Sequence, residues 1–205
     1  MNTNQSDTNQ FDDVVTFPKL IGITGRKFNG KDTVGNYYVS NHGYVRLAFA
    51  DALKKACGEI FGFTDEQLYG NEKEIIDEFW KVSPRVVLQY VGTDLFREQL
   101  CQIMPEVGNN IWVKVVQKKI LSAWKSNPNA CFVVTDVRFP NECKMIRDMG
   151  GIVIRVKRDS VNNTADTHSS ETEIENLTVD FEISNNGTKP ELYDNAKNIL
   201  FLSVV

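Results

Sequence analysis

The amino-acid sequence predicts an α/β fold in which a doubly wound, mainly parallel sheet is flanked by helices. Two observations support this prediction. Brief apolar runs rich in β-branched residues, such as KLIGITG and CFVVT, alternate with longer stretches of helical periodicity. The chain of 205 residues also has the length of one well-buried domain. Such a sheet binds ligands at the carboxyl ends of its strands.

The expected elements alternate along the chain. After the strand KLIGITG, we expect a helix over 32–42, a strand over 44–49 and a helix over 51–61. A helix then begins at Ser83, a plausible N-cap followed by Pro84 at the first helical position. The later elements are a helix over 110–125, a strand over 131–135, a helix from Pro140 to the glycines at 150 and 151, a strand over 152–156, the strand VDFEIS and a closing helix.

Composition narrows the classes of function. A net charge of -4 with 24% charged residues is ordinary for a globular protein and disfavours binding to polymeric nucleic acid. No apolar run is long enough to span a membrane, and the start of the chain lacks a secretory signal. The four cysteines have no CxxC spacing and are expected to be reduced. We therefore expect a cytoplasmic protein.

The expected organisation is a disordered polar leader over 1–14 and a single domain over 15–205. Within that domain, 62–125 is expected to be a helical part. The composition becomes strongly polar over 158–178, which is the expected place of a mobile lid.

The stretch ITGRKFNGKDT completes the GxxxxGK part of a phosphate-binding loop, between an expected strand and an expected helix. Glycines let backbone N–H groups surround phosphate oxygens, the helix N-terminus adds its positive dipole, and Lys31 adds a charge. The residues assigned to ATP in this loop are Gly25, Arg26, Lys27, Asn29, Gly30, Lys31, Asp32 and Thr33. A Gly-rich turn before a helix is the structural alternative.

Asp32 stands where such loops usually carry the hydroxyl that binds magnesium, and Thr33 follows it. Because magnesium prefers hard oxygen ligands and keeps several waters, Asp32 can hold it directly or through water, with Thr33 as a second oxygen. The alternative is that Asp32 only caps the helix.

A nucleotide site alone could belong to a kinase, a GTPase-like switch or a dehydrogenase. The spacing of Gly22, Gly25 and Gly30 does not fit GxGxxG, and the sequence has no NKxD motif for guanine. A kinase would also need cations to bind the phosphate of its acceptor. Arg85, Gln89, Thr93 and Arg97 recur every fourth residue and share one drifting face if the helix from Ser83 continues. A solvated charged face is the alternative interpretation of these side chains.

Asp136 follows the buried strand FVVT, where a carboxylate could hold magnesium through water. Arg138, two residues later, is a candidate for contacting the transferred phosphoryl group. Alternatively, Arg138 and Glu142 form a structural ion pair.

The motifs GRKFNGKDT, LAFADALK, SPRVVLQYVGTDLFR, VVTDVRFPNE and ISNNGTKPEL occur in that order. With them the chain resembles the deoxynucleoside monophosphate kinases of bacteriophages, a P-loop kinase family, from about residue 20 to residue 192. The resemblance implies a nucleoside monophosphate kinase-like fold. It also implies transfer of the γ-phosphoryl group of ATP, with Mg²⁺, to deoxynucleoside monophosphates.

The resemblance also implies roles for individual residues. Lys31, Asp32 and Thr33 would serve ATP and magnesium, and the family's own loop also reads GKDT. Asp136, Arg138, Arg85 and Lys31 would act at the transferred group. The implied acceptor-side residues are Asp51, Lys54, Arg85, Gln89, Gly92, Thr93, Arg97, Trp112, Arg138 and Glu142. Trp112 could stack on a base or belong to the core, and a helix cap and a surface lysine would explain Asp51 and Lys54.

Arg158, at the end of its strand, and Asn186, in NNGT, are further expected ATP contacts, although NNGT is also an ordinary turn. His168 and Glu171 match a motif of the family without an assignable role. Two rival functions stay open: a kinase for another phosphorylated acceptor such as dephospho-coenzyme A, and a non-catalytic nucleotide-binding module. A homodimer is expected only by analogy with related kinases of this size.

Overall fold

The computed structural model describes residues 17–159 and 174–203. Its centre is a sheet of five strands in the order β2-β3-β1-β4-β5, with every pairing parallel. This confirms the predicted α/β class. The expected leader over 1–14 and most of the expected lid over 158–178 lie outside the described residues. The strands are β1 (Leu20–Thr24), β2 (Val45–Leu47), β3 (Phe132–Val137), β4 (Ile152–Lys157) and β5 (Phe181–Ser184).

The central strand β1 is buried along its whole length because it has neighbours on both sides and helices on both faces. Gly22 pairs in register with Val134 of β3 and Val153 of β4. Burial on both faces explains why the strand sequences are continuously apolar rather than alternating. The crossover order brings the ends of β1, β3 and β4 together at one edge of the sheet.

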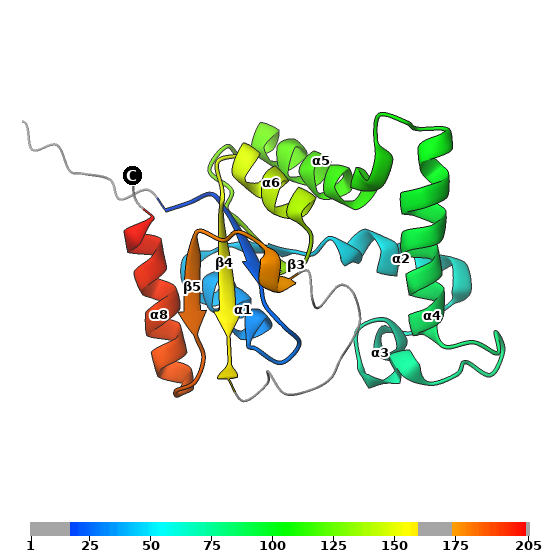
Figure 1. Cartoon of the computed structure of the whole chain (residues 1–205), viewed down its shortest axis with the longest axis horizontal. Helices are drawn as coiled ribbons and strands as arrows, with labels where there is room; N and C mark the ends of the chain where they lie inside the picture. Colours follow the sequence, from blue (N-terminus) through cyan, green and yellow to red (C-terminus); the bar gives the residue numbers. More distant parts are fainter. Residues whose placement is uncertain (1–16, 160–173, 204–205) are drawn as a thin grey trace, which may run out of the picture.

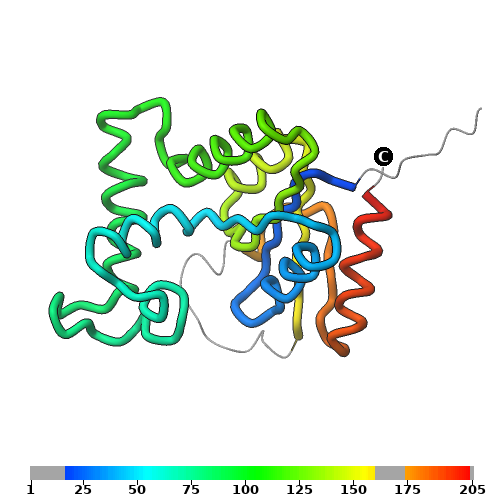
Figure 2. Tube along the Cα trace, turned by 180° about the vertical axis from the view of Figure 1, so that it is seen from behind, coloured from blue at the N-terminus to red at the C-terminus, as the bar shows by residue number. Residues whose placement is uncertain are grey.

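Two helical layers cover the sheet (Figures 1 and 2). Helices α1 (Lys31–His42) and α8 (Lys189–Leu202) pack on one face, around a core that includes Val34, Tyr38 and Leu200. Helices α5 (Ile111–Ser126) and α6 (Pro140–Asp148) pack on the other face, where Ile120 and Ile146 are fully buried. Both layers continue the doubly wound arrangement that the alternation of elements predicts.

A helical part extends from the sheet on the side away from α8 (Figure 1). It has its own small core, which includes Cys57, Phe63 and Leu88. Its elements are α2 (Ala50–Phe61), α3 (Asp65–Leu68), the 3₁₀ helix η1 (Asn71–Glu74), α4 (Pro84–Gln89), η2 (Tyr90–Gln99), and the 3₁₀ helices η3 (Leu100–Gln102) and η4 (Gly108–Asn110).

The helix expected from Ser83 begins as predicted, because the Ser83 hydroxyl accepts the N–H of Val86 and Pro84 occupies the first turn. It does not continue as a uniform α-helix. From Tyr90 to Gln99 it is a π-helix, a rare form that is frequent at functional sites. The strand expected over 44–49 is also shorter, since β2 lies at the edge of the sheet and pairs only with β3.

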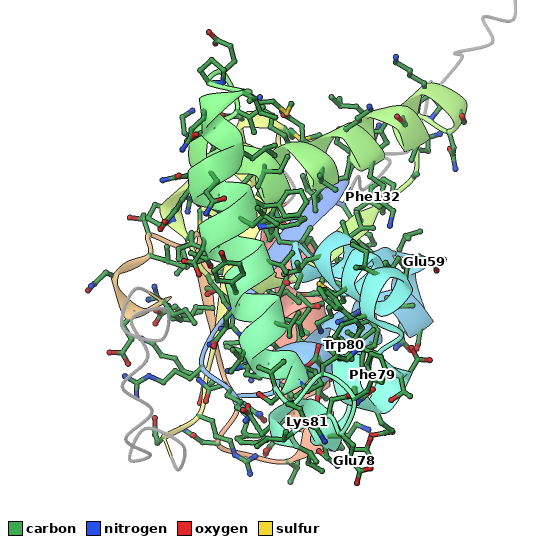
Figure 3. All side chains as sticks on the ribbon, turned by 90° about the vertical axis from the view of Figure 1, so that its right-hand side faces the viewer. Glu59, Glu78, Phe79, Trp80, Lys81 and Phe132 are labelled. Atoms are coloured by element: carbon green, nitrogen blue, oxygen red, sulfur yellow. The ribbon has the colours of Figure 1, made fainter. Side chains whose placement is uncertain are left out.

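The tip of the helical part carries two aromatic side chains, Phe79 and Trp80 (Figure 3). Phe79 is 81% exposed, whereas Trp80 packs edge-on against Phe61 and donates its ring N–H to the Phe61 carbonyl. All four cysteines are free thiols, as predicted. In the described parts of the chain, no helix has both the length and the apolar character needed to cross a membrane.

Candidate active site

The predicted phosphate-binding loop lies between β1 and α1, at the carboxyl edge of the sheet. Gly25 and Gly30 both adopt positive φ angles, 143° and 99°, which side chains rarely allow. A Cβ atom at Gly25 would also overlap the carbonyl oxygen of Val156. The two glycines of the GxxxxGK pattern are therefore required by the backbone of the loop.

Side chains from distant segments brace this loop. Asn29 donates to the carbonyl oxygen of Val156 at 3.0 Å, and Asn185 donates to the carbonyl oxygen of Asn29 at 2.8 Å. Within the loop, Lys31 donates to the carbonyl oxygen of Arg26 at 2.8 Å. The loop is thus fixed to β4 and to the turn after β5 as well as to its own helix.

Asp32 lies in the first turn of α1, and its side chain is 75% exposed. Its carboxylate is 3.6 Å from the guanidinium of Arg46 on β2. The helix N-cap is Gly30, and no side chain makes a cap hydrogen bond there. The capping role considered for Asp32 is therefore not what this structure shows.

Asp136 links the end of β3 to the start of α2. Its two carboxylate oxygens accept the backbone N–H groups of Phe49 at 2.8 Å and Ala50 at 3.1 Å. Burial raises the pKa of Asp136, while these two hydrogen bonds and the positive charge of Arg138 oppose the rise. Asp136 therefore positions α2, a role that its sequence context alone does not reveal.

Glu142 is the most buried carboxylate of the site, with 2% of its surface exposed. It accepts the backbone N–H groups of Arg138 at 2.7 Å and Phe139 at 3.1 Å, which holds the start of α6. Arg97 lies 3.7 Å from it and stacks over the ring of Phe139. Burial raises the pKa of Glu142 to about 7, and the hydrogen bonds and Arg97 limit the rise.

The π-helical winding of η2 affects how the predicted acceptor face is presented. Residues four apart drift forward around an α-helix, but they drift backward around a π-helix, which takes more residues per turn. By this geometry, the forward drift from Arg85 to Gln89 in α4 is offset by a backward drift over Thr93 and Arg97 in η2. Arg85 approaches Glu74 at 3.7 Å, whereas Arg97 reaches Glu142 on α6.

Lys73 is a residue that the sequence reasoning missed. It lies in η1, which packs against the start of α4. Burial, followed by the positive charges of Arg85, Lys27 and Arg138, lowers its pKa. Lys73 thus lies within electrostatic reach of cations from the phosphate-binding loop, from α4 and from the loop after β3. Lys73 lies in the polar stretch NEKE. Nothing in that stretch distinguishes it from a solvated lysine.

Asp51 and Lys54 lie on α2, on the same side as this group. Asp51 accepts the N–H of Ala48 at 3.0 Å, while the N-cap position of α2 is Phe49 and has no side-chain cap hydrogen bond. Lys54 lies 4.4 Å from the ring centre of Tyr69, and burial and the nearby charge of Lys73 lower its pKa. The structure therefore places Lys54 and Lys73 in one cationic region.

Trp112 is 7% exposed and belongs to the core between α5 and the sheet. Its ring packs against Phe96, and its N–H donates to the carbonyl oxygen of Gly92 at 2.9 Å. The observed packing fits the interpretation of Trp112 as a core residue. Gly92 is needed here too, because a Cβ atom would be 2.7 Å from Leu53.

The expected ATP contacts beyond the loop are less closely gathered. Asn186 exchanges two hydrogen bonds with Asp159, one at 2.7 Å and one at 2.9 Å. Arg158 is exposed. Of the expected acceptor-side residues, Gln89 and Thr93 are exposed as well. His168 and Glu171 lie outside the described residues.

Comparisons with known proteins agree with this geometry. The family model described as deoxynucleotide monophosphate kinase matches residues 61–196. A protein of Acanthamoeba polyphaga mimivirus, provisionally named as a deoxynucleotide monophosphate kinase, is 42% identical over 178 residues, which cover 85% of this chain and 92% of that protein. The deoxynucleotide monophosphate kinase of Enterobacteria phage T4 is 31% identical, with 89% of this chain and 98% of that protein covered.

Solved structures support the fold alone. The crystal structure of TT1252 from Thermus thermophilus matches with a TM-score of 0.50 at 19% identity, over 93% of this chain and 100% of that one. The family model covers more than half of the chain, and the mimivirus relative covers most of it. The chain therefore belongs to the deoxynucleotide monophosphate kinase family and is a P-loop kinase.

Proposed function

We propose that the enzyme transfers the γ-phosphoryl group of ATP to a deoxynucleoside monophosphate, giving the diphosphate, between the phosphate-binding loop and the helical part. The observation that carries this assignment is a group of four cations from four separate segments. They are Lys27, Lys73, Arg85 and Arg138, and the positive charges of Arg85, Lys27 and Arg138 each lie close enough to Lys73 to lower its pKa. Such a concentration of like charge suits two phosphate-bearing ligands that meet end to end.

On the donor side, the loop backbone and Lys31 would bind the β- and γ-phosphates of ATP. Lys31 would exchange the carbonyl oxygen of Arg26 for a phosphate oxygen, which requires only a small movement of a flexible side chain. Asn29 and Asn185 would keep the loop in shape during this exchange. Their contacts support a loop whose shape is set before ATP binds.

The oxygen ligands near the loop fit a magnesium ion that keeps much of its water shell. Asp32 is exposed enough to reach such an ion, and Thr33 follows it in the same turn. The oxygens of Asp136 each accept one backbone N–H, so this carboxylate would act through bound water. Bound magnesium would neutralise charge on the phosphates of ATP.

On the acceptor side, Arg85 and Lys73 would hold the monophosphate, while Arg138 would face the group in transfer. A phosphate oxygen of the acceptor then attacks the γ-phosphorus, and the bond from that phosphorus to the bridging oxygen of ADP breaks. No protein nucleophile is required, so positioning and charge neutralisation account for catalysis. Arg97 would act indirectly, by fixing Glu142 and with it the backbone of Arg138.

The test is product formation with ATP and a panel of acceptors: deoxynucleoside monophosphates, the matching ribonucleotides and dephospho-coenzyme A. We expect diphosphate products from at least one deoxynucleoside monophosphate and no phosphorylation of dephospho-coenzyme A. The Lys31→Ala variant serves as the control for contaminating kinases. Binding of ATP without transfer to any acceptor would instead support the non-catalytic module.

A further inference from the structure

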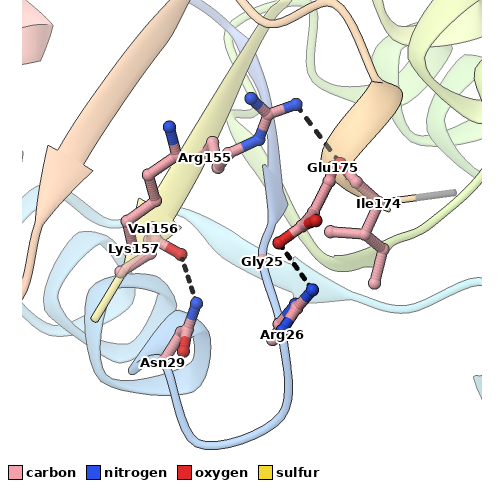
Figure 4. Close-up of a pocket in the computed structure, with 8 residues that line it drawn as sticks. All are labelled: Gly25, Arg26, Asn29, Arg155, Val156, Lys157, Ile174 and Glu175. Carbon is pink, nitrogen blue, oxygen red and sulfur yellow. Dashed lines mark hydrogen bonds and ion pairs between the residues drawn. The ribbon is translucent and has the colours of Figure 1, made fainter. Parts of the chain in front are cut away.

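An acidic side chain lies against the phosphate-binding loop from the side of β4. The carboxylate of Glu175 is 2.6 Å from the guanidinium of Arg26, which directly follows Gly25 (Figure 4). The Arg26 side chain is 25% exposed, so this ion pair is partly shielded from water. Arg26 also belongs to the donor loop through its carbonyl oxygen, which accepts from Lys31. Glu175 therefore acts on a residue of the loop itself.

The backbone around Glu175 is anchored independently of Arg26. Arg155, on β4, donates to the carbonyl oxygens of Ile174, at 3.2 Å, and Leu177. The side chains of Ile174 and Leu177 are buried. Arg155 is held in turn by Glu182 of β5 at 2.8 Å. Removing the charge of Glu175 should therefore leave its segment in place.

These residues enclose a cavity of about 130 Å³, which is too small for a nucleotide. The loop residues Gly25, Arg26 and Asn29 line one side, Arg155 and Lys157 line another, and Glu175 completes it. Glu182 pairs with both Arg155 and Lys157. The local charge is therefore three cations against two carboxylates. Among the described residues, the buried Nε–H of Arg155 has no hydrogen-bond partner.

We infer that Glu175 competes with the triphosphate of ATP for Arg26. The inference rests on the proposed donor site, since it concerns ATP bound at this loop. A carboxylate and a phosphate are alternative partners of the same kind for a guanidinium group, and both form short charge-assisted hydrogen bonds. A positively charged wall beside a phosphate-binding loop attracts anions, and the carboxylate of Glu175 lowers that attraction. Binding of ATP would draw Arg26 from Glu175 towards the phosphates.

A competing role and a purely structural role of Glu175 predict opposite changes in ATP binding when its charge is removed. If Glu175 only positions the loop, its loss disorders Arg26 and weakens ATP binding. If Glu175 competes, the isosteric change Glu175→Gln removes one negative charge near the phosphates and strengthens binding. The Glu175 side chain is 57% exposed, so its charge is screened nearly as in bulk water. At that screening, a unit charge about 4 Å away corresponds to about a three- to tenfold change in affinity.

The experiment measures equilibrium binding by calorimetry to the full chain, without an acceptor, for wild type, Glu175→Gln and Asp148→Asn. Asp148 forms an exposed ion pair with Lys144 on α6 and controls for the change in net charge. The ligands are ATP, inorganic tripolyphosphate and adenosine. We expect Glu175→Gln to bind ATP and tripolyphosphate about three- to tenfold more tightly, with adenosine unchanged and Asp148→Asn like wild type.

Unchanged or weaker binding of both phosphate ligands by a folded Glu175→Gln variant would overturn the inference. An equal gain in Asp148→Asn would also overturn it, because net charge would then be the cause. A wild-type enzyme that binds ATP but phosphorylates no monophosphate would sink the proposed function and leave this comparison valid. Measurement at two salt concentrations adds a second readout, since a competing charge predicts a steeper salt dependence in Glu175→Gln.

Discussion

The guanidinium of Arg97 lies 3.7 Å from the carboxylate of Glu142, across the junction between the helical part and the sheet domain. Glu142 in turn holds the backbone of Arg138, so a residue of η2 is connected to the loop after β3. Through this connection, the position of η2 and the position of Arg138, the proposed catalytic arginine, both depend on one buried carboxylate.

That carboxylate predicts a specific dependence of stability on pH. The pKa of Glu142 rises from 4.5 to about 7 on folding, so the folded protein binds an extra proton between these values. Its contribution is therefore fully present below pH 4.5 and is lost as pH rises through 7. Urea unfolding of wild type and Glu142→Gln should show wild type losing on the order of 2–3 kcal/mol relative to the variant from acidic to mildly alkaline pH. Parallel pH profiles would contradict the assignment.

Lys31→Ala should leave a folded enzyme whose activity is reduced by roughly two to three powers of ten. One preorganised charge contact to the transition state is worth about 3–4 kcal/mol. The fold should survive because the lysine does not belong to any of the apolar cores. Initial rates measure the loss of activity, and circular dichroism checks the fold. Near-normal turnover in a folded variant would show that the loop takes no part in the mechanism.

Asp32→Asn should raise the magnesium concentration needed for half-maximal activity. Asp32→Ser should bring that concentration part of the way back to the wild-type value. A carboxylate binds magnesium more strongly than an amide, and its nearby partner Arg46 is retained in each variant. Arg46→Ala provides a matched control, since it removes the ion pair and leaves the carboxylate. If Arg46→Ala and Asp32→Asn shift the metal requirement in the same direction and by the same amount, the ion pair explains the effect.

Arg85→Lys should raise the Michaelis constant for the monophosphate more than that for ATP, whereas Arg138→Lys should chiefly lower turnover. A guanidinium grips phosphate with two parallel hydrogen bonds, which an ammonium group cannot reproduce. The effect of each substitution should be similar for the monophosphates of every accepted base. Steady-state kinetics with two monophosphates decide the matter, and an effect of Arg85→Lys confined to ATP would place the acceptor pocket elsewhere.

Lys73→Ala should lower kcat/KM for every accepted monophosphate by about ten- to a hundredfold, the loss of one partly desolvated contact to phosphate. Lys55→Ala, which removes an exposed lysine of α2, is the matched control and should behave as wild type. If the two variants behave alike, Lys73 is an ordinary solvated lysine and does not contact the phosphate. Lys73→Arg should recover part of the lost activity, since it restores the charge.

The sequence predicted the sheet and the donor loop well because both depend on local signals. Strands buried on two faces are continuously apolar, and the loop needs glycine at two backbone positions. Asp136 was predicted to follow its strand, but β3 runs to Val137 and includes it. Its contact with the start of α2 joins residues 86 positions apart. Local patterns carry no information about such a contact.

The same limitation explains the missed residues. Lys73 and Glu175 lie in polar stretches whose composition is that of ordinary surface, and only the packing of η1 and of the segment beside β4 makes them part of the site. Trp112 shows the converse. Its place in a motif suggested contact with a base, while its surroundings show a ring that fills the core.

The π-helix of η2 also has a consequence for how this enzyme can change over time. A single-residue deletion between Tyr90 and Gln99 would let the segment return to ordinary α-helical winding, which is the more stable form. Because an α-helix turns further per residue than a π-helix, Arg97 would then keep nearly the same direction with one residue fewer before it. Loss of one residue from this segment should therefore be tolerated better than loss of one from a regular α-helix, and homologous enzymes that lack the extra residue would keep the contact between the arginine and the carboxylate.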